Sequence, residues 1–438
     1  MNQLVEDNNR NIVILINDYW PEYGTALEKL SQRLGRPLKG VLLVDMHVKE
    51  AGRNFPDPSG RFETIVCDFS HLRSISDALN PIADNVLLVA SSSERNQPYL
   101  KKALPHLPYV NGPSESSLDW ATHKATMREL MRSFNGALAP KSETVHEHTE
   151  DDIQRVLRNL DFPLIVKPNG LAASILVNRA NNEEELREFL SHSFEVIDKI
   201  YARDKGRGKP SILCEEFIEG DMYSVDSYIN SQGDVWSLPL VKVTTAYAIG
   251  KEGFYSYQLD TALDLTEQDI KEAHETARQA MLSLGLRSTV GHIEMFKTVN
   301  GWKLIELGPR AGGYRQDMYE LGHGIDHAYN EFLVKIDLEP EVTPTKQSYC
   351  SCLNMYADEE GVIESIEGFE EAQNNPSVFR LTAWLKPGDM ALNCGNGGKY
   401  IIDGVLHNDS LDQLNKDLED VRNTIKITTV PVKEVAHV

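Results

Sequence analysis

The sequence has no hydrophobic run approaching the roughly 20 residues that a membrane-spanning helix requires. It opens with MNQLVEDNNR, which lacks the basic and then apolar segments of a secretory leader. Its five cysteines are too few and too scattered for a disulfide framework or a zinc site. We therefore expect a soluble, reduced, cytoplasmic protein.

Positive charge is scarce. The 438 residues include 44 Lys and Arg against 66 Asp and Glu, which gives a formal net charge of −22. This balance argues against binding to nucleic acid or to an anionic membrane, because both need broad positive surfaces. A small anionic ligand remains compatible with it, since such a ligand needs only a local cluster of cations.

A dinucleotide fingerprint is also missing. Residues 11–17, 40–45 and 85–90 have the composition of buried parallel strands, and residues 25–34 and 72–79 have helical spacing between them. This alternation predicts a doubly wound α/β domain. After the first strand the chain reads Asn17-Asp18-Tyr19-Trp20-Pro21 instead of G-x-G-x-x-G. The domain either helps to hold a non-nucleotide substrate or is structural only.

The most informative stretch is residues 292–313, HIEMFKTVNGWKLIELGPRAGG. Two alternating runs around Asn300-Gly301 predict a β-hairpin. Each strand carries one acid among apolar neighbours, Glu294 and Glu306, and two such acids are costly in a packed interior unless a cation lies between them. Mg²⁺ holding a phosphate is the natural candidate. Arg310 follows, suited to bidentate contact with phosphoryl or carboxylate oxygens.

The hairpin register tests this interpretation. A strict two-residue loop would place Glu294 and Glu306 on opposite faces of the sheet. A three-residue loop with a bulge at Gly301 makes them face each other directly, so a shared metal predicts the bulged loop. The alternative is that Glu306 only caps a strand or forms a salt bridge.

Two lysines precede the hairpin. Residues 121–134 form an amphipathic helix with Lys124 on its apolar stripe, where the lysine either snorkels to solvent or points into a site. Residues 162–168 form a strand that contains Lys167, followed by a loop of small residues that ends at Ser174. Such a loop lets backbone N–H groups approach phosphates while the ammonium neutralises them.

Residues 211–220 form the next strand. Glu215 lies between apolar neighbours and could accept a hydrogen bond from an exocyclic amine such as that of adenine, while the backbone at Glu216 and Ile218 completes the contact with the base edge. A purely structural pair of glutamates at a strand edge is the alternative.

The order and spacing of these motifs, over roughly residues 113–335, resemble those of the ATP-grasp ligases, and most of all the amino-acid ligases that form dipeptides. The resemblance implies an α/β and α+β protein with an ATP-grasp fold. Residues 1–112 would form the N-terminal domain and 113–162 a linker helix and core entry. Residues 163–235 would form the lid, and 236–438 the C-terminal catalytic subdomain.

The resemblance also implies roles. Lys124, Lys167 and Ser174 would bind the ATP phosphates, and Glu215, Glu216 and Ile218 would bind adenine. Glu294 and Glu306 would bind Mg²⁺, as two ions with Mn²⁺ as an alternative, and Arg310 would stabilise the acyl phosphate. Two positions depart from the family pattern: Gly308 replaces a metal-binding Asn, and Met222 replaces an acid for the ribose, for which Asp221 would substitute.

The implied reaction transfers the γ-phosphoryl group of ATP to a small-molecule carboxylate, after which an amine attacks the acyl phosphate to give an amide, ADP and phosphate. The implied assembly is a homodimer that binds neither nucleic acid nor membrane. Two other functions stay open: a degenerate or regulatory nucleotide-binding module, and a bicarbonate-activating carboxylase. For His292 and His323, both substrate contact and a structural role remain possible from the sequence. For Lys242 and Lys251, the alternatives are contact with phosphate and exposure to solvent.

Overall fold

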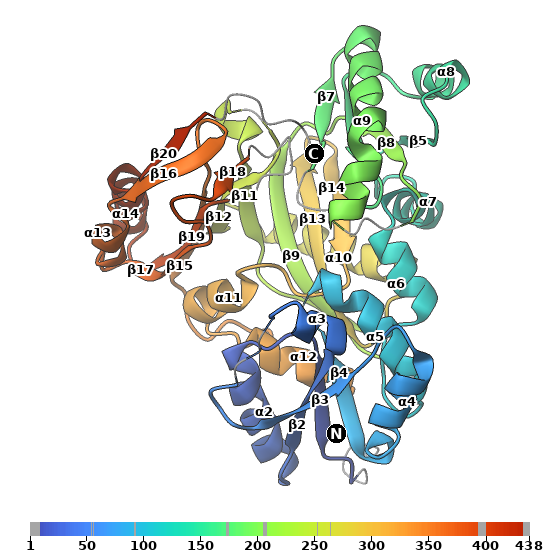
Figure 1. Cartoon of the computed structure of the whole chain (residues 1–438), viewed down its shortest axis with the longest axis vertical. Helices are drawn as coiled ribbons and strands as arrows, with labels where there is room; N and C mark the ends of the chain where they lie inside the picture. The colour runs from blue at the N-terminus through green and yellow to red at the C-terminus, as the bar shows by residue number, and fades with distance from the viewer. Residues whose placement is uncertain are drawn as a thin grey trace.

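The structure is a computed structural model that describes residues 9–53, 55, 57–91, 93–171, 175–204, 208–251, 253–262, 264–392 and 400–431. Ser174, predicted to bind phosphate, lies outside them. The described chain contains four β-sheets arranged along an elongated molecule (Figure 1). No helix within the described ranges is long and apolar enough to cross a membrane.

The N-terminal sheet has the order β3-β2-β1-β4, and all of its pairings are parallel. Its strands are β1 (Ile12–Ile16), β2 (Lys39–Asp45), β3 (Phe62–Cys67) and β4 (Val86–Ala90). The three strands expected from the sequence are confirmed. Edge strand β3 was missed, because most of its residues are exposed or half-buried and it lacks a continuous apolar run.

Helices cover both faces of this sheet, as a doubly wound domain requires. Helices α2 (Pro21–Leu34) and α12 (His327–Lys335) pack on one face. Helices α4 (Leu72–Leu79) and α5 (Gln97–Ala103) pack on the other. Because α12 belongs to the C-terminal half of the chain, it fixes that half to the N-terminal domain (Figure 1).

A second sheet has four strands in the order β5-β8-β6-β7. We call it the lid sheet, because most of it comes from the residues predicted to form the lid. Its elements are β5 (Ser142–Val145), β6 (Leu164–Pro168), β7 (Asn178–Ala180), β8 (Ile212–Glu216), α8 (Glu150–Asn159) and α9 (Glu183–Asp204). The sequence placed the lid at 163–235. In the structure β5 joins the lid sheet, and the strand that begins at Asp221 already belongs to the next sheet.

The central sheet has nine strands, with the order β14-β13-β9-β11-β12-β15-β19-β17 and β10 beside β9. Helices α7 and α10 pack against one face, and α11 lies against the other. The strands are β9 (Asp221–Ile229), β10 (Val235–Ser237), β11 (Val241–Thr245), β12 (Ser256–Thr261), β13 (Thr289–Thr298), β14 (Gly301–Gly308), β15 (Tyr349–Met355), β17 (Val378–Ala383) and β19 (Ile402–Asn408). The helices are α7 (Lys124–Phe134), α10 (Glu267–Ser283) and α11 (Arg315–His323).

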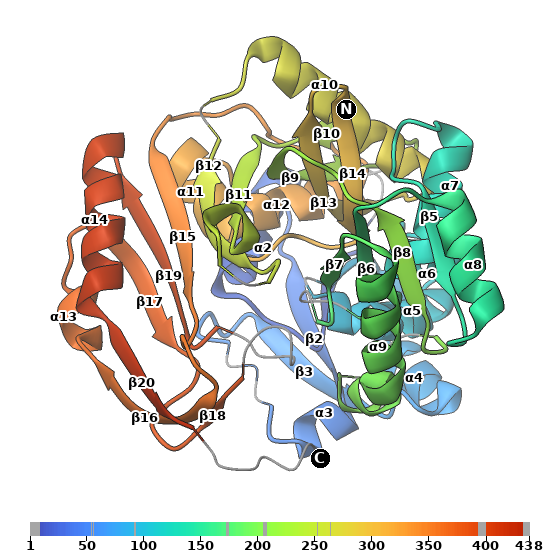
Figure 2. The same ribbon diagram turned by 90° about the horizontal axis from the view of Figure 1, so that it is seen from above.

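The C-terminal part adds a third layer at the far edge of the central sheet, which Figure 2 shows from above. A small sheet and two helices cover β15, β17 and β19 there. These elements are β16 (Gly361–Glu367), β18 (Met390–Ala391), β20 (Lys426–Val430), α13 (Phe369–Gln373) and α14 (Leu411–Thr424). The remaining helices are α3 (Met46–Glu50) and α6 (Glu115–Thr122), with short 3₁₀ turns η1 to η4 between elements.

Candidate nucleotide and metal site

The predicted hairpin is β13 and β14, and Glu294 stands directly opposite Glu306. The prediction that the two acids face each other is therefore confirmed, but the predicted three-residue loop is wrong. Thr298 pairs with Gly301, so the loop has two residues, and the extra residue lies further along β14 at Ile305. A bulge within the strand shifts the register as effectively as one in the loop.

Arg128 explains why the bulge lies at Ile305. Its guanidinium donates a hydrogen bond to the Ile305 carbonyl and, through Nε, another to Glu215 Oε2 at 2.9 Å. Arg128 is only 1% exposed. Sequence reasoning missed this residue, although it follows Lys124 by four positions and therefore shares its helix face.

Lys124 points into the site rather than to solvent. Its Nζ lies 3.1 Å from Glu306 Oε1 and donates to the Leu171 carbonyl at 2.7 Å. Burial alone would raise the pKa of Glu306, but the ammonium groups of Lys124 and Lys167 outweigh it and lower the pKa to about 2. Glu306 is thus held ionised, as a metal ligand must be.

Lys167 lies beside this pair, on strand β6 of the lid. Its Nζ forms an ion pair with Glu215 Oε1, and both residues are buried. Burial lowers the pKa of Lys167, and the Glu215 charge opposes that shift. Burial would raise the pKa of Glu215, but Arg128 and Lys167 together lower it. The carboxylate assigned to adenine is therefore already held by two cations.

The remaining residues assigned to the base and ribose lie where β8 leads into β9. The Glu216 carboxylate forms an ion pair with Lys303, and Ile218 is half-buried in the connection. On β9, Met222 and not Asp221 shares the face of Glu294, because Ser224 pairs with Glu294 and side chains alternate. The structure therefore places Asp221 on the opposite face, against its expected role as a ribose ligand.

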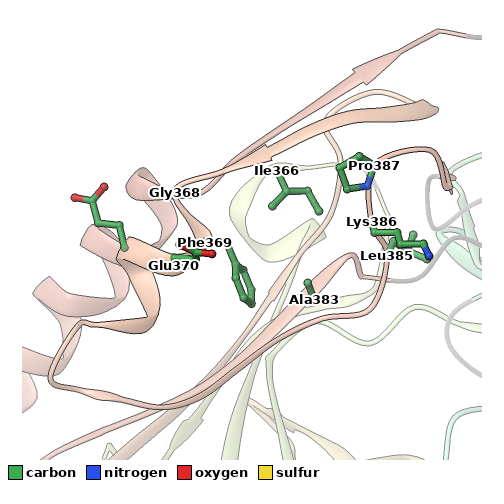
Figure 3. Close-up of a pocket in the computed structure, with 9 residues that line it drawn as sticks. Ile366, Gly368, Phe369, Glu370, Ala383, Leu385, Lys386 and Pro387 are labelled. Carbon is green, nitrogen blue, oxygen red and sulfur yellow. The ribbon is translucent and has the colours of Figure 1, made fainter.

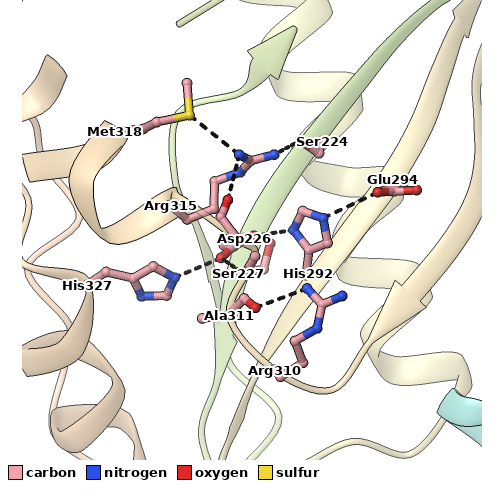
Figure 4. Close-up of polar contacts among 12 residues, drawn as sticks. Ser224, Asp226, Ser227, His292, Glu294, Arg310, Ala311, Arg315, Met318 and His327 are labelled. Carbon is pink, nitrogen blue, oxygen red and sulfur yellow. Dashed lines mark hydrogen bonds and ion pairs between the residues drawn. The ribbon is translucent and has the colours of Figure 1, made fainter. Parts of the chain in front are cut away.

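Arg310 lies in the turn after β14 and is partly exposed (Figure 4). Its Nη1 donates to the Ala311 carbonyl at 3.0 Å, and its Nη2 lies 3.4 Å from Glu94 Oε2 in the N-terminal domain. Glu94 follows β4, so it comes from the carboxyl end of a parallel strand, where α/β domains bind ligands. Sequence reasoning missed Glu94.

The four residues whose roles the sequence left undecided lie in different places. His292 lies at the site and faces Glu294, with Nε2 3.5 Å from Oε1 (Figure 4). His323 is buried in α11, and its Nε2 has no hydrogen-bond partner in the described chain. Lys242 pairs with Asp264 at 2.7 Å, and Lys251 lies 4.0 Å from Asp358.

The chemistry of Glu294 and Glu306 fits Mg²⁺, a hard cation that prefers carboxylate oxygens. No group of three or more His, Cys, Asp or Glu ligands exists among the described residues. A cation bound here would therefore complete its shell with phosphate oxygens and water, which is the usual mode of Mg²⁺ at nucleotide sites.

The structure also has a surface pocket of about 500 Å³ in the C-terminal layer (Figure 3). Phe369 and Ile366 line it together with Lys386 and Pro387. None of the residues assigned to nucleotide or metal lines this pocket, so it is separate from the candidate site.

Comparison with known proteins identifies the domain that holds the site. Residues 160–317 match the ATP-grasp domain family. The chain contains an ATP-grasp domain. The fold as a whole resembles that of an L-amino acid ligase from Bacillus licheniformis, with a TM-score of 0.72 and 18% identity over 97% of this chain and 100% of that one. The predicted ATP-grasp fold is therefore confirmed.

The curated relatives of this chain are distant. A D-alanine–D-alanine ligase of Pediococcus pentosaceus is 26% identical over 213 residues, which cover 46% of this chain and 53% of that protein. The uncharacterized protein y4rH of Sinorhizobium fredii is 21% identical over 286 residues, which cover 65% of this chain and 56% of that protein. The chain thus spans about half the length of these two relatives.

Proposed function

We propose that the protein is an ATP-dependent ligase that activates a small-molecule carboxylate, an amino acid by preference, and joins it to an amine. One observation carries the proposal: Glu294 and Glu306 face each other on one hairpin, with Lys124 on Glu306 and Lys167 beside it. Relatives named as an L-amino acid ligase and a D-alanine–D-alanine ligase support this class of reaction.

The residues suit each step. A carboxylate oxygen of the substrate attacks the γ-phosphorus of ATP, the bond to the bridging oxygen breaks, and ADP leaves. Lys124 and Lys167 neutralise the charge on the transferring group, and Arg310 binds the oxygens of the acyl phosphate. Mg²⁺ held by Glu294 and Glu306 would supply further charge neutralisation. The amine then attacks the acyl carbon and phosphate leaves, giving the amide.

Water must be kept from the acyl phosphate, because hydrolysis would waste the activated carboxyl group. The lid sheet suits this task, since β6 and β8 carry Lys167 and Glu215, and the Lys167 ammonium helps to lower the pKa of Glu306 on the hairpin. We infer that the lid closes over bound ATP, with these two side chains exchanging some of their mutual contacts for contacts with the nucleotide.

The test is to incubate purified protein with Mg²⁺-ATP and mixtures of amino acids, then measure released ADP and identify products by mass. The expected result is ADP release that depends on a carboxylate substrate, together with a new amide product. ATP binding that Lys167→Ala abolishes, with no turnover on any carboxylate, would instead favour a regulatory nucleotide-binding module.

A further inference from the structure

A buried carboxylate that the proposed reaction does not use lies on β9, the strand that pairs with β13 of the hairpin. Asp226 is 0% exposed. Its two oxygens accept hydrogen bonds from His292 Nδ1 at 2.6 Å and His327 Nε2 at 2.7 Å (Figure 4). A third hydrogen bond comes from the Gly312 amide at 2.7 Å, so three different parts of the chain meet at this carboxylate.

Asp226 is ionised in this environment. Burial alone would raise its pKa, but His292 and His327 hold the pKa well below its usual range. Because a carboxylate can only accept, both imidazole nitrogens that face it carry protons. Asp226 therefore fixes the orientation of each ring.

One of these rings reaches the metal site. His292 turns Nδ1 toward Asp226, so its opposite edge faces Glu294, with Nε2 3.5 Å from Oε1. Residues 292 and 294 lie on the same face of β13. Asp226 thus fixes the ring that limits where the Glu294 carboxylate can lie.

The same carboxylate holds the turn that carries Arg310. Gly312 follows Arg310 by two residues, and its amide donates a hydrogen bond to Asp226 Oδ2. The turn packs so closely that a Cβ added to Gly312 would lie 2.5 Å from His292 Nδ1 and 2.7 Å from Arg315 Cγ. One carboxylate therefore sets the spacing between the Arg310 turn and the strand of Glu294.

His327, the other histidine that contacts Asp226, connects this carboxylate to the interface with the N-terminal domain. His327 begins α12, the helix that packs on the N-terminal sheet, and its Nδ1 lies 2.6 Å from the buried hydroxyl of Tyr228. A buried hydrogen-bonded network of this kind specifies a single geometry, although apolar packing of equal volume would often be as stable.

We propose that Asp226 is a positioning residue of the phosphoryl-transfer site, which fixes Glu294 through His292 and the Arg310 turn through Gly312. This proposal rests on the proposed role of Glu294 as a metal ligand. Removing groups that orient the ligands of a metal typically weakens metal binding about 10- to 100-fold.

The test measures Mn²⁺ binding in the presence of ADP by electron paramagnetic resonance, with thermal unfolding recorded on the same samples. We expect Asp226→Asn to weaken Mn²⁺ binding about ten-fold. The control is Asp417→Asn on α14, another buried carboxylate, which accepts from Ser377 Oγ at 2.5 Å and from Gln413 Nε2 at 2.9 Å. Asp417→Asn should leave Mn²⁺ binding unchanged.

Wild-type Mn²⁺ binding by Asp226→Asn, or equal weakening by Asp417→Asn, would overturn the positioning role. Glu294→Gln tests the proposed function separately from the positioning role of Asp226. If Glu294→Gln binds Mn²⁺ as the wild type does, Glu294 is not a metal ligand and the proposed function itself fails. If Asp226→Asn does not fold, His292→Gln replaces it, because the amide keeps a donor near Asp226 but withdraws the ring from Glu294. Unchanged binding in that variant would equally overturn the proposal.

Discussion

The lid sheet and the hairpin both carry acids of the candidate nucleotide site, but they hold them in different ways. Glu215 on lid strand β8 has a side chain only 5% exposed and is bound by two cations. Glu294 and Glu306 on the hairpin have side chains 31% exposed, and Lys124 pairs with only one of them. The lid acid is neutralised within the protein, whereas Glu294 on the hairpin keeps negative charge available for a ligand.

This difference predicts that stability and activity will separate in mutants. A buried ion pair that loses one partner leaves an unpaired charge in the interior, which is strongly destabilising. A partly exposed carboxylate can be replaced at small cost, because water solvates what remains. Variants of Glu215 or Arg128 should therefore act mainly on folding, and variants of Glu294 mainly on catalysis.

The largest effect is expected for Glu294→Gln. Loss of a charged metal ligand should lower ADP release on the order of 10³-fold, comparable to removing a main electrostatic contact of a transition state. Unfolding free energy should change by less than about 0.5 kcal/mol, because the side chain is partly exposed. Steady-state ADP assays and denaturant unfolding check both parts. A variant with wild-type turnover would remove the hairpin from the mechanism.

Arg128→Met tests the lid side of the comparison. It leaves Glu215 with one cation and the Ile305 carbonyl without its donor, so we expect destabilisation of about 3–5 kcal/mol. Adding Glu215→Gln should restore part of this loss. The matched control is Arg278→Met, which breaks an exposed pair with Glu275 on α10 and should cost no more than about 0.5 kcal/mol. Urea unfolding of all variants gives the comparison, and equal losses at the two arginines would contradict it.

The hairpin shows what the sequence could predict. Alternation and the Asn-Gly turn were enough to predict both strands, and the demand that two acids share a cation was enough to predict that they face each other. The position of the bulge could not be predicted, because it depends on Arg128, which is 177 residues away from Ile305 in the chain. A local sequence pattern cannot predict a hydrogen bond between residues so far apart in the chain.

The same limit applies to the residues that were missed. Asp226, Arg128 and Glu94 all act through partners from other elements. Of the three, only Arg128 has a local signal, its spacing of four residues from Lys124. Asp221 was assigned because it adjoins Met222, which stands where the family has an acid, but pairing with β13 decides which face it occupies. Sequence reasoning thus identified residues with local motifs, whereas register and long-range pairing determined the rest.

The pH dependence of stability tests the electrostatic environment of Glu306 on the hairpin. The pKa of Glu306 is lowered from 4.5 to about 2 in the folded protein. A lowered carboxyl pKa contributes stability that is present above the unfolded value and is lost as protons bind the folded state. Wild-type stability should therefore fall between about pH 4.5 and pH 2, and Glu306→Gln should lose part of that dependence. Urea midpoints measured across this range check it, and identical slopes in the two proteins would contradict it.

The smallest effect is expected from adding a ligand to the hairpin. Gly308 stands where the ATP-grasp resemblance implies a metal-binding Asn, and a Cβ there would lie 3.5 Å from Arg310 Cζ, an ordinary contact. Gly308→Asn should fit and supply one more oxygen, so that Mn²⁺ binds a few-fold more tightly in the presence of ADP, since affinity rises with the number of protein ligands. Gly136→Asn, at a position where an added Cβ meets nothing within 4 Å, is the control for a new surface amide. Weaker binding in Gly308→Asn alone would mean that the hairpin acids and the phosphates already complete the shell, and that the glycine keeps space for Arg310 to move.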